Sequence, residues 1–253
     1  MTWIDSHCHL QMGDGDGAAA DAVARAVDAG VERMICIGTD LESSRRAVEL
    51  AARHAEVWAT IGLHPHDASR LEEEWDGLSE LAGAGRVVGV GETGFDLYYR
   101  HSEPEQQEEA FRRHIRLARE RHLALVIHSR DAWEETFSVL ESEGVPERTV
   151  FHCFTGGPDE ARRALAAGTW LSFSGIVSFK GAQPLRDAAA LTPADRLLVE
   201  TDSPFLAPVP HRGRPNEPAY LPAVGAALAQ ARGETLEQVA ALTRGTALAV
   251  FWP

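Results

Sequence analysis

The chain has 253 residues, of which 44% are hydrophobic and 25% are charged, an ordinary composition for a globular protein. Its net charge of −14 argues against tight sequence-independent binding of duplex DNA, because such binding needs many Lys and Arg contacts to phosphates. Three cysteines, an odd number, together with the lack of a secretion signal and of an apolar run of about 18 residues, predict a cytoplasmic protein that does not enter a membrane.

Short apolar runs alternate with helix-like segments along the whole chain. The runs predict strands at Trp3–Asp5, Arg33–Ile37, Trp58–Gly62, Val87–Gly91, Ala124–His128, Thr149–His152, Trp170–Phe173 and Leu197–Thr201. The intervening segments predict helices at Ala18–Ala29, Leu41–His54, Ser69–Ala82, Glu103–Arg121, Ala132–Glu143, Asp159–Ala167 and Ala182–Ala190, with two more near Pro218–Ala231 and Thr235–Ala249. Eight strands that each precede a helix predict an α/β fold, a (β/α)8 TIM barrel, as one domain over residues 1–253.

Side chains that bind metals lie at or just past the ends of these predicted strands. In a barrel of this kind the carboxyl ends of the strands converge on one mouth, where active sites form. We therefore expect six side chains to meet there in a catalytic metal site: His7, His9, Glu92, His128, His152 and Asp202.

The spacing of these residues suggests two metals. His7 and His9 alternate on one strand and so face the same side, next to Asp202 if the eighth strand pairs with the first. Glu92 is placed to bridge, with His128 and His152 as ligands of the second metal. A carboxylated lysine cannot bridge at any strand but the seventh, because Lys180 is the only lysine. We expect two divalent ions, Mg, Mn or Zn; imidazole and carboxylate also suit Fe and Ni.

Two metals about 3.5–4 Å apart activate a shared water and neutralise the attacking and leaving oxygens of a displacement at phosphorus. Asp202 is the expected residue that orients or deprotonates this water, with Glu92 as the bridging carboxylate. Glu200, on the same strand face, is either a helper of this centre or an acid of the barrel's interior polar layer.

Cations and aromatic residues in the same set of loops suggest how a substrate is held. Arg130, Lys180 and Arg214, with Arg100 and Arg212, form a predicted group that binds phosphates. The histidines of Gly62-Leu63-His64-Pro65-His66 are placed to touch a phosphate or leaving group. Four aromatic residues either stack on bases or pack in the core: Tyr98, Tyr99, Phe154 and Phe179.

At these residues the chain resembles the TatD-related metal-dependent hydrolases, the TatD-type deoxyribonucleases. The resemblance implies an amidohydrolase-like TIM barrel, divalent metals and hydrolysis of phosphodiester bonds, often as a 3′-exonuclease on single-stranded DNA. It also implies that the six residues named above are metal ligands, that His64 lies in the substrate pocket and that Asp96 is an acid behind the ligands. The matching segments are Asp5-Ser6-His7-Cys8-His9, Gly62-Leu63-His64-Pro65, Gly91-Glu92-Thr93-Gly94-Phe95-Asp96, His128-Ser129-Arg130, His152-Cys153-Phe154-Thr155-Gly156, Ser172-Phe173-Ser174-Gly175, Glu200-Thr201-Asp202-Ser203-Pro204 and Arg214-Pro215-Asn216-Glu217-Pro218.

Two departures from the family pattern stand out. His114 replaces a Gln that is frequent in relatives, and Thr246 and Ala249 replace an Asn and an Arg in the last predicted helix. We expect a monomer with DNA as substrate, either single strands or 3′ ends, and no obligatory protein partner. Two alternatives stay open: an ester or amide hydrolase, such as the family members that act on D-aminoacyl-tRNA, and a non-catalytic metal-binding scaffold.

Overall fold

In the computed structural model, which describes residues 1–13 and 15–253, eight parallel strands form one sheet in the order β1 to β8. The strands are β1 Trp3–Cys8, β2 Val31–Ile37, β3 Val57–Ile61, β4 Val87–Asp96, β5 Ala124–Arg130, β6 Thr149–Phe151, β7 Trp170–Phe173 and β8 Leu197–Val199. The helices are α1 Gly15–Asp28, α2 Leu41–Arg53, α3 Leu71–Leu81, α4 Pro104–Arg121, α5 Trp133–Glu143, α6 Pro158–Ala166, α7 Gln183–Leu191, α8 Leu221–Arg232 and α9 Leu236–Phe251. Short 3-10 helices are η1 Leu10–Met12, η2 Pro65–Arg70, η3 Gly175–Ser178, η4 Ala194–Arg196 and η5 Pro218–Tyr220.

The sheet closes into a barrel through the segment that follows β8. Ser203 forms a parallel bridge with Cys8. The amide of Asp202 donates to the carbonyl of His7 at 2.9 Å, and the amide of His9 donates to the carbonyl of Ser203 at 2.8 Å. The same hydrogen bonds that close the barrel therefore place Asp202 beside the two histidines of β1.

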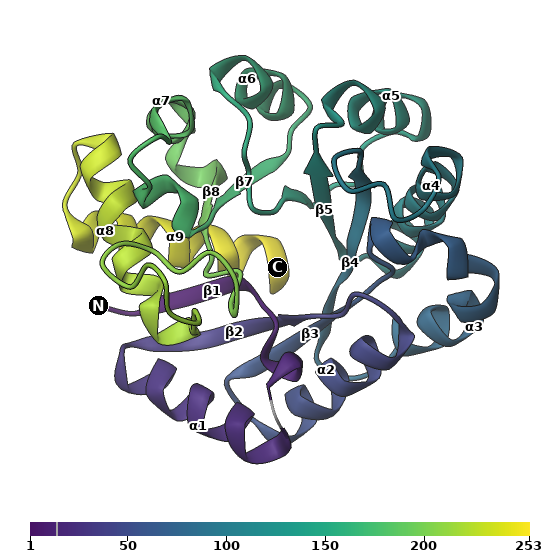
Figure 1. Cartoon of the computed structure of the whole chain (residues 1–253), viewed down its shortest axis with the longest axis horizontal. Helices are drawn as coiled ribbons and strands as arrows, with labels where there is room; N and C mark the ends of the chain where they lie inside the picture. The colour runs from purple at the N-terminus through teal and green to yellow at the C-terminus, as the bar shows by residue number, and fades with distance from the viewer. Residues whose placement is uncertain (14) are drawn as a thin grey trace.

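Apolar side chains pack on both sides of the sheet. The larger core lies between the strands and the surrounding helices, which form the outer ring in Figure 1. The smaller core fills the barrel interior with inward-facing residues that include Ile35, Val88 and Val126. Val250 and Phe251 of α9 belong to this inner core, so the last helix closes the amino-terminal end of the barrel and leaves the carboxyl end open to substrates.

All eight predicted strands and all nine predicted α-helices are present, and the TIM barrel is confirmed. The bounds differ most at β4, which continues past Glu92 to Asp96 because it pairs with β5 as far as Arg130. Glu92 thus lies within its strand rather than just past it. None of the helices in the described ranges combines the length and the hydrophobicity that a membrane-spanning segment needs.

Candidate metal centre

The predicted ligands meet at the carboxyl end of the barrel, around a cavity of about 750 Å³. His7 is fully buried in its wall, and five of the other predicted ligands reach the cavity surface. The lining also includes His64, His66, Asp96 and Arg130. Residues from β1, β4, β5 and the segments after β3, β6 and β8 therefore share one site, as the barrel pattern predicts.

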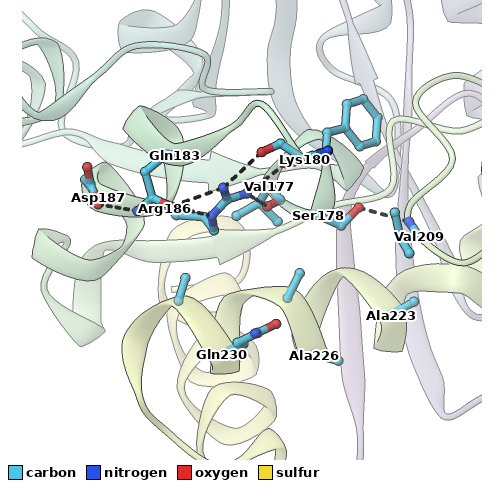
Figure 2. A pocket seen from close by; sticks show the side chains of 13 residues that line it. Val177, Ser178, Lys180, Gln183, Arg186, Asp187, Val209, Ala223, Ala226 and Gln230 are labelled. Carbon is cyan, nitrogen blue, oxygen red and sulfur yellow. Dashed lines mark hydrogen bonds between the residues drawn. The ribbon is translucent and has the colours of Figure 1, made fainter.

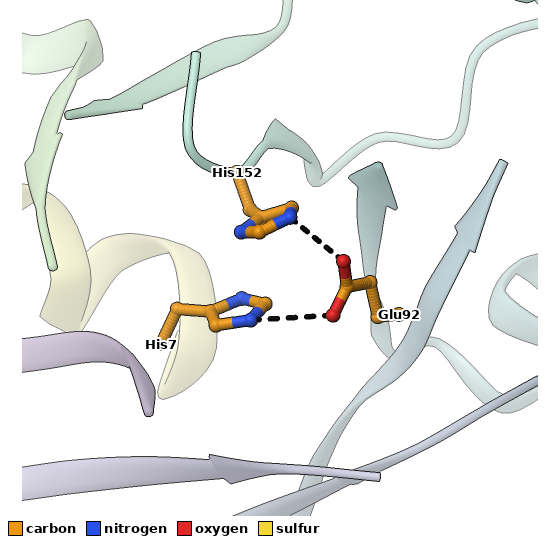
Figure 3. Close-up of side chains that lie close together, drawn as sticks. All are labelled: His7, Glu92 and His152. Atoms are coloured by element: carbon orange, nitrogen blue, oxygen red, sulfur yellow. Dashed lines mark ion pairs between the residues drawn. The ribbon is translucent and has the colours of Figure 1, made fainter. Parts of the chain in front are cut away.

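Glu92 lies at the middle of this site, with one carboxylate oxygen directed to each of two groups of imidazoles. Its Oε2 is 3.4 Å from Nε2 of His7, and its Oε1 is 2.8 Å from Nε2 of His152, as Figure 3 shows. Oε1 is also 2.7 Å from Nδ1 of His128. This is the arrangement that a carboxylate needs if it is to bridge two cations.

The first group consists of His7, His9 and Asp202. The two Nε2 atoms are 3.3 Å apart, and Oδ1 of Asp202 lies 3.7 Å from His7 and 3.4 Å from His9. Ligands about 2.1 Å from a cation and at a tetrahedral angle to one another lie about 3.4 Å apart. The spacing of these three atoms therefore fits one divalent cation.

The second group consists of His128 and His152, with His64 close by. Nδ1 of His128 is 3.3 Å from Nε2 of His152, again a spacing that fits shared coordination. His64 Nε2 lies 3.5 Å from Oε1 of Glu92, so His64, Glu92 and His128 form a further possible ligand set. His64, for which the family resemblance implies a place in the substrate pocket, thus lies close enough to Glu92 to join the metal centre.

The electrostatics of the site favour ionised carboxylates. Burial favours the neutral form of Glu92, but the charge of His152 and the hydrogen bonds from His128 and His152 outweigh it and hold the pKa of Glu92 well below its usual value. The pKa of Asp202 is likewise lowered, since the hydrogen bond from His9 and the neighbouring imidazoles outweigh burial. Burial lowers the pKa of His64 to about 4, which leaves its ring neutral and its lone pair free for a cation.

Carboxylates behind the ligands orient the imidazoles of the second group. Asp96 Oδ2 lies 3.5 Å from Nε2 of His128, and Oε1 of Glu200 lies 3.3 Å from Nδ1 of His152. Glu200 Oε1 also accepts a hydrogen bond from the amide of Cys153 at 2.7 Å, which fixes its position. Carboxylates in such positions set the tautomer and direction of a metal-binding histidine.

The predicted phosphate-binding residues separate in the structure. Arg130 lines the cavity of the metal centre. Lys180 instead lines a second groove of about 640 Å³, in which η3 and α7 face the alanines of α8 (Figure 2). Arg214 lines neither cavity but is exposed in the loop after β8. Of the predicted aromatic residues, Phe154 packs in the core against Trp133 and Phe173 and is not available to a base.

Several residues that build the site were not identified from the sequence. Phe205, two residues past Ser203, lines the cavity, and its ring centroid lies 6.0 Å from that of His9. Asn216 donates to the carbonyls of Thr201 and Phe205 and so holds the loop after β8. An aromatic residue in the loop after the eighth strand was the available signal for Phe205. Asn216 lies in the matching segment Arg214-Pro215-Asn216-Glu217-Pro218, but only the structure reveals the hydrogen bonds that it donates.

Comparison with known proteins gives a consistent result. A family model described as TatD related DNase matches residues 4–252. The uncharacterized metal-dependent hydrolase TatD of Mycobacterium tuberculosis is 42% identical and aligns over 96% of each chain. A protein of Cronobacter sakazakii named 3'-5' ssDNA/RNA exonuclease TatD is 40% identical over 91% of this chain and 90% of its own. The crystal structure of YJJV, a TatD homolog from Escherichia coli K12, superposes with a TM-score of 0.90 at 29% identity, covering 98% of this chain and 97% of the other.

Proposed function

This chain belongs to the TatD-related DNase family, and from that membership we propose that it hydrolyses phosphodiester bonds of single-stranded DNA from the 3′ end. Relatives in this family are named metal-dependent hydrolases, which supports metal-dependent hydrolysis as the general reaction. The direction and the substrate are supported by relatives such as the Cronobacter sakazakii protein, which is named a 3'-5' exonuclease on single-stranded DNA and RNA.

The observation that carries this proposal is the position of Glu92 between two groups of ligands. Four of the predicted ligands, all histidines, surround its carboxylate, with His7 and His9 at one oxygen and His128 and His152 at the other. Two divalent cations bound there would activate water and neutralise negative charge on the phosphate oxygens. Mg, Mn and Zn are the proposed cations, because imidazole and carboxylate ligands accept all three.

The protein's own side chains accept the proton and bind the phosphates of the strand. Asp202, ionised because its pKa is lowered, accepts the proton of the attacking water. The water oxygen bonds to phosphorus while the bond from phosphorus to the 3′ oxygen of the preceding nucleotide breaks. That oxygen takes a proton from solvent and becomes the 3′ hydroxyl of the shortened strand, and a nucleoside 5′-monophosphate is released. Arg130 faces the cavity and binds a phosphate of the same strand. Lys180 and Arg214 lie outside the cavity, and they bind phosphates farther along the DNA strand.

We also propose a cytoplasmic location for the protein. All three cysteines, Cys8, Cys36 and Cys153, are free thiols, which is typical of a reducing compartment.

The test is hydrolysis of a 5′-labelled single-stranded oligonucleotide in separate reactions with Mg, Mn and Zn. We expect stepwise shortening from the 3′ end and release of mononucleotides. Glu92→Gln, which keeps the shape of the side chain but removes the bridging charge, is expected to lower kcat at least a thousandfold. An unchanged circular dichroism spectrum serves as the folding control. Hydrolysis of D-aminoacyl-tRNA with no cleavage of DNA would contradict the proposal.

A further inference from the structure

Large apolar side chains that remain exposed gather at the mouth of the metal centre. Tyr98, Tyr99 and Phe205 are 59%, 52% and 51% exposed, and Met12 is also exposed. Tyr99, Phe205 and Met12 line the cavity of the metal centre. Aromatic rings left in water around a polar site indicate a ligand that covers them.

Two of these rings form a platform with Arg130 on one side of the cavity. The guanidinium carbon of Arg130 lies 4.3 Å from the ring centroid of Tyr98 and 4.7 Å from that of Tyr99. The two tyrosine rings meet edge to face with centroids 4.8 Å apart. We call Tyr98, Tyr99 and Arg130 the aromatic platform. Arg130 is exposed and lines the cavity, so its guanidinium can bind a phosphate there.

Hydrogen bonds to Asp96 connect the loop of the aromatic platform to the metal centre. Oδ1 of Asp96 accepts the amides of Tyr98 and Tyr99 at 3.0 and 2.9 Å, while its Oδ2 faces His128. The buried side chain of Gln107 accepts the amide of Asp96 at 2.9 Å and donates to the carbonyl of Ser102 at 2.9 Å. The loop is therefore held in place before any substrate binds, which lowers the entropic cost of binding.

Phe205 supplies a second aromatic surface on the other side of the cavity. Phe205 follows β8, whereas the two tyrosines of the aromatic platform follow β4, and these strands are four positions apart in the eight-stranded order. The contact between the rings of Phe205 and His9 places this second surface directly beside the first group of ligands. The metal centre thus lies between two aromatic surfaces.

We propose that these two surfaces hold unpaired bases on either side of the phosphate that is cleaved. This inference rests on the proposed function and deepens it, because it assigns the residues that select a single strand. Bases in a duplex are stacked and paired, so their faces cannot reach two separated aromatic surfaces, whereas a flexible single strand turns its bases outward. Each stacked base contributes about 1–3 kcal/mol to binding.

The test compares an intact single-stranded oligonucleotide with one that is abasic at its two 3′-terminal positions. Binding is measured by fluorescence anisotropy in EDTA, where no hydrolysis occurs. The wild-type protein is expected to prefer the intact strand by about tenfold or more, since stacking contributes that much per base. Tyr99→Ala and Phe205→Ala are each expected to lower affinity for the intact strand about tenfold and to reduce the preference by the same factor.

Two further variants serve as controls. Tyr99→Phe keeps the ring and is expected to restore the preference that Tyr99→Ala loses. Val209→Ala, an exposed apolar residue of the same loop as Phe205 that lines the second groove, is expected to bind as the wild type does. Thermal melts confirm that each variant is folded.

The outcomes separate the two proposals. Equal binding of both oligonucleotides by the wild type, binding of neither, or an unchanged preference in both alanine variants overturns the base-stacking inference. Lack of hydrolysis by the wild type with any of the three metals overturns the proposed function instead, while the binding preference still decides whether the aromatic surfaces hold bases.

Discussion

Asp96 is the residue that links the second ligand group to the substrate side of the site. One oxygen faces His128 and His66, at 3.5 and 2.9 Å, and the other accepts two backbone amides of the loop after β4. Its pKa lies far below its usual value, because hydrogen bonds from His128, from the Tyr99 amide and from His66 outweigh burial. An ionised carboxylate in this position keeps His128 aligned for a cation.

Asp96→Asn tests this role. The amide has only one oxygen, so it cannot accept from both the imidazoles and the backbone amides. We expect divalent metal affinity to fall about 10–100-fold, the range found when such partners are removed. Calorimetric titration with Mn measures the affinity, and Asp187→Asn in α7, away from the metal centre, is the matched control. Unchanged affinity in Asp96→Asn would contradict the assignment.

His114 makes stability depend on pH without belonging to the metal centre. Its ring is buried, its Nδ1 donates to the carbonyl of Ala110 at 2.6 Å, and its Nε2 accepts the amide of Leu63 at 3.0 Å. Burial lowers the pKa of His114 from 6.5 to about 4. In the unfolded chain His114 is protonated below about pH 6.5, whereas in the folded protein it stays neutral down to about pH 4. The free energy of unfolding therefore decreases as the pH falls from 6.5 to about 4.

His114→Gln tests this prediction, since glutamine does not titrate. Between pH 7 and pH 5 the free energy of unfolding is expected to fall by roughly 2 kcal/mol more in the wild type than in the variant. The size follows because each pH unit below the unfolded-state pKa costs about 1.4 kcal/mol. Urea denaturation at the two pH values measures the difference. Parallel losses in the two proteins would show that His114 does not carry the effect.

Among the elements, the end of β3 approaches the middle of β4 so closely that a side chain does not fit. A Cβ built on Gly62 would lie 2.5 Å from the carbonyl carbon of Gly91 and 2.9 Å from the amide nitrogen of Glu92. Both neighbours are backbone atoms, so the strand that carries Glu92 would have to move. The glycine of Gly62-Leu63-His64-Pro65 thus lets the end of β3 pack against the backbone of Gly91 and Glu92.

Gly62→Ala is expected to cost about 1–3 kcal/mol of stability, the usual penalty for overpacking. It is also expected to weaken metal binding, because Glu92 shifts relative to the imidazoles. Thermal unfolding and Mn titration measure the two effects. Gly85→Ala is the control, since a Cβ there meets nothing within 4 Å. A variant that keeps wild-type stability and metal affinity would refute the packing argument.

The order of elements was predictable because β-rich runs and helical segments alternate regularly, and barrel closure then brings the strand ends together. The six candidate ligands were predicted from that step: residues as distant as His7 and Asp202 meet because each lies at the carboxyl end of a strand. Loop side chains lack such a rule. Arg130 lines the cavity of the metal centre, whereas Lys180 lines the second groove beside α8, and nothing in their spacing distinguishes them.

At the scale of the whole molecule, the barrel is open at one end and closed at the other. Phe251 of α9 is buried in the inner core with Val250 and Ile4. Phe251→Ala removes most of a ring from this core and is expected to lower the unfolding free energy by about 3–5 kcal/mol. Chemical denaturation measures the loss, and Val27→Ala, exposed on α1, is the control. A loss below about 1 kcal/mol would mean that α9 does not close the barrel as described.

The central proposal is that Glu92 shares its carboxylate between two cations at the open end of the barrel. Crystals soaked in Mn, with their anomalous diffraction recorded, provide the test. We predict two peaks about 3.5–4 Å apart, one at each oxygen of Glu92, with His7 and His9 at the first and His128 and His152 at the second. A single peak, or peaks that do not contact Glu92, would contradict it.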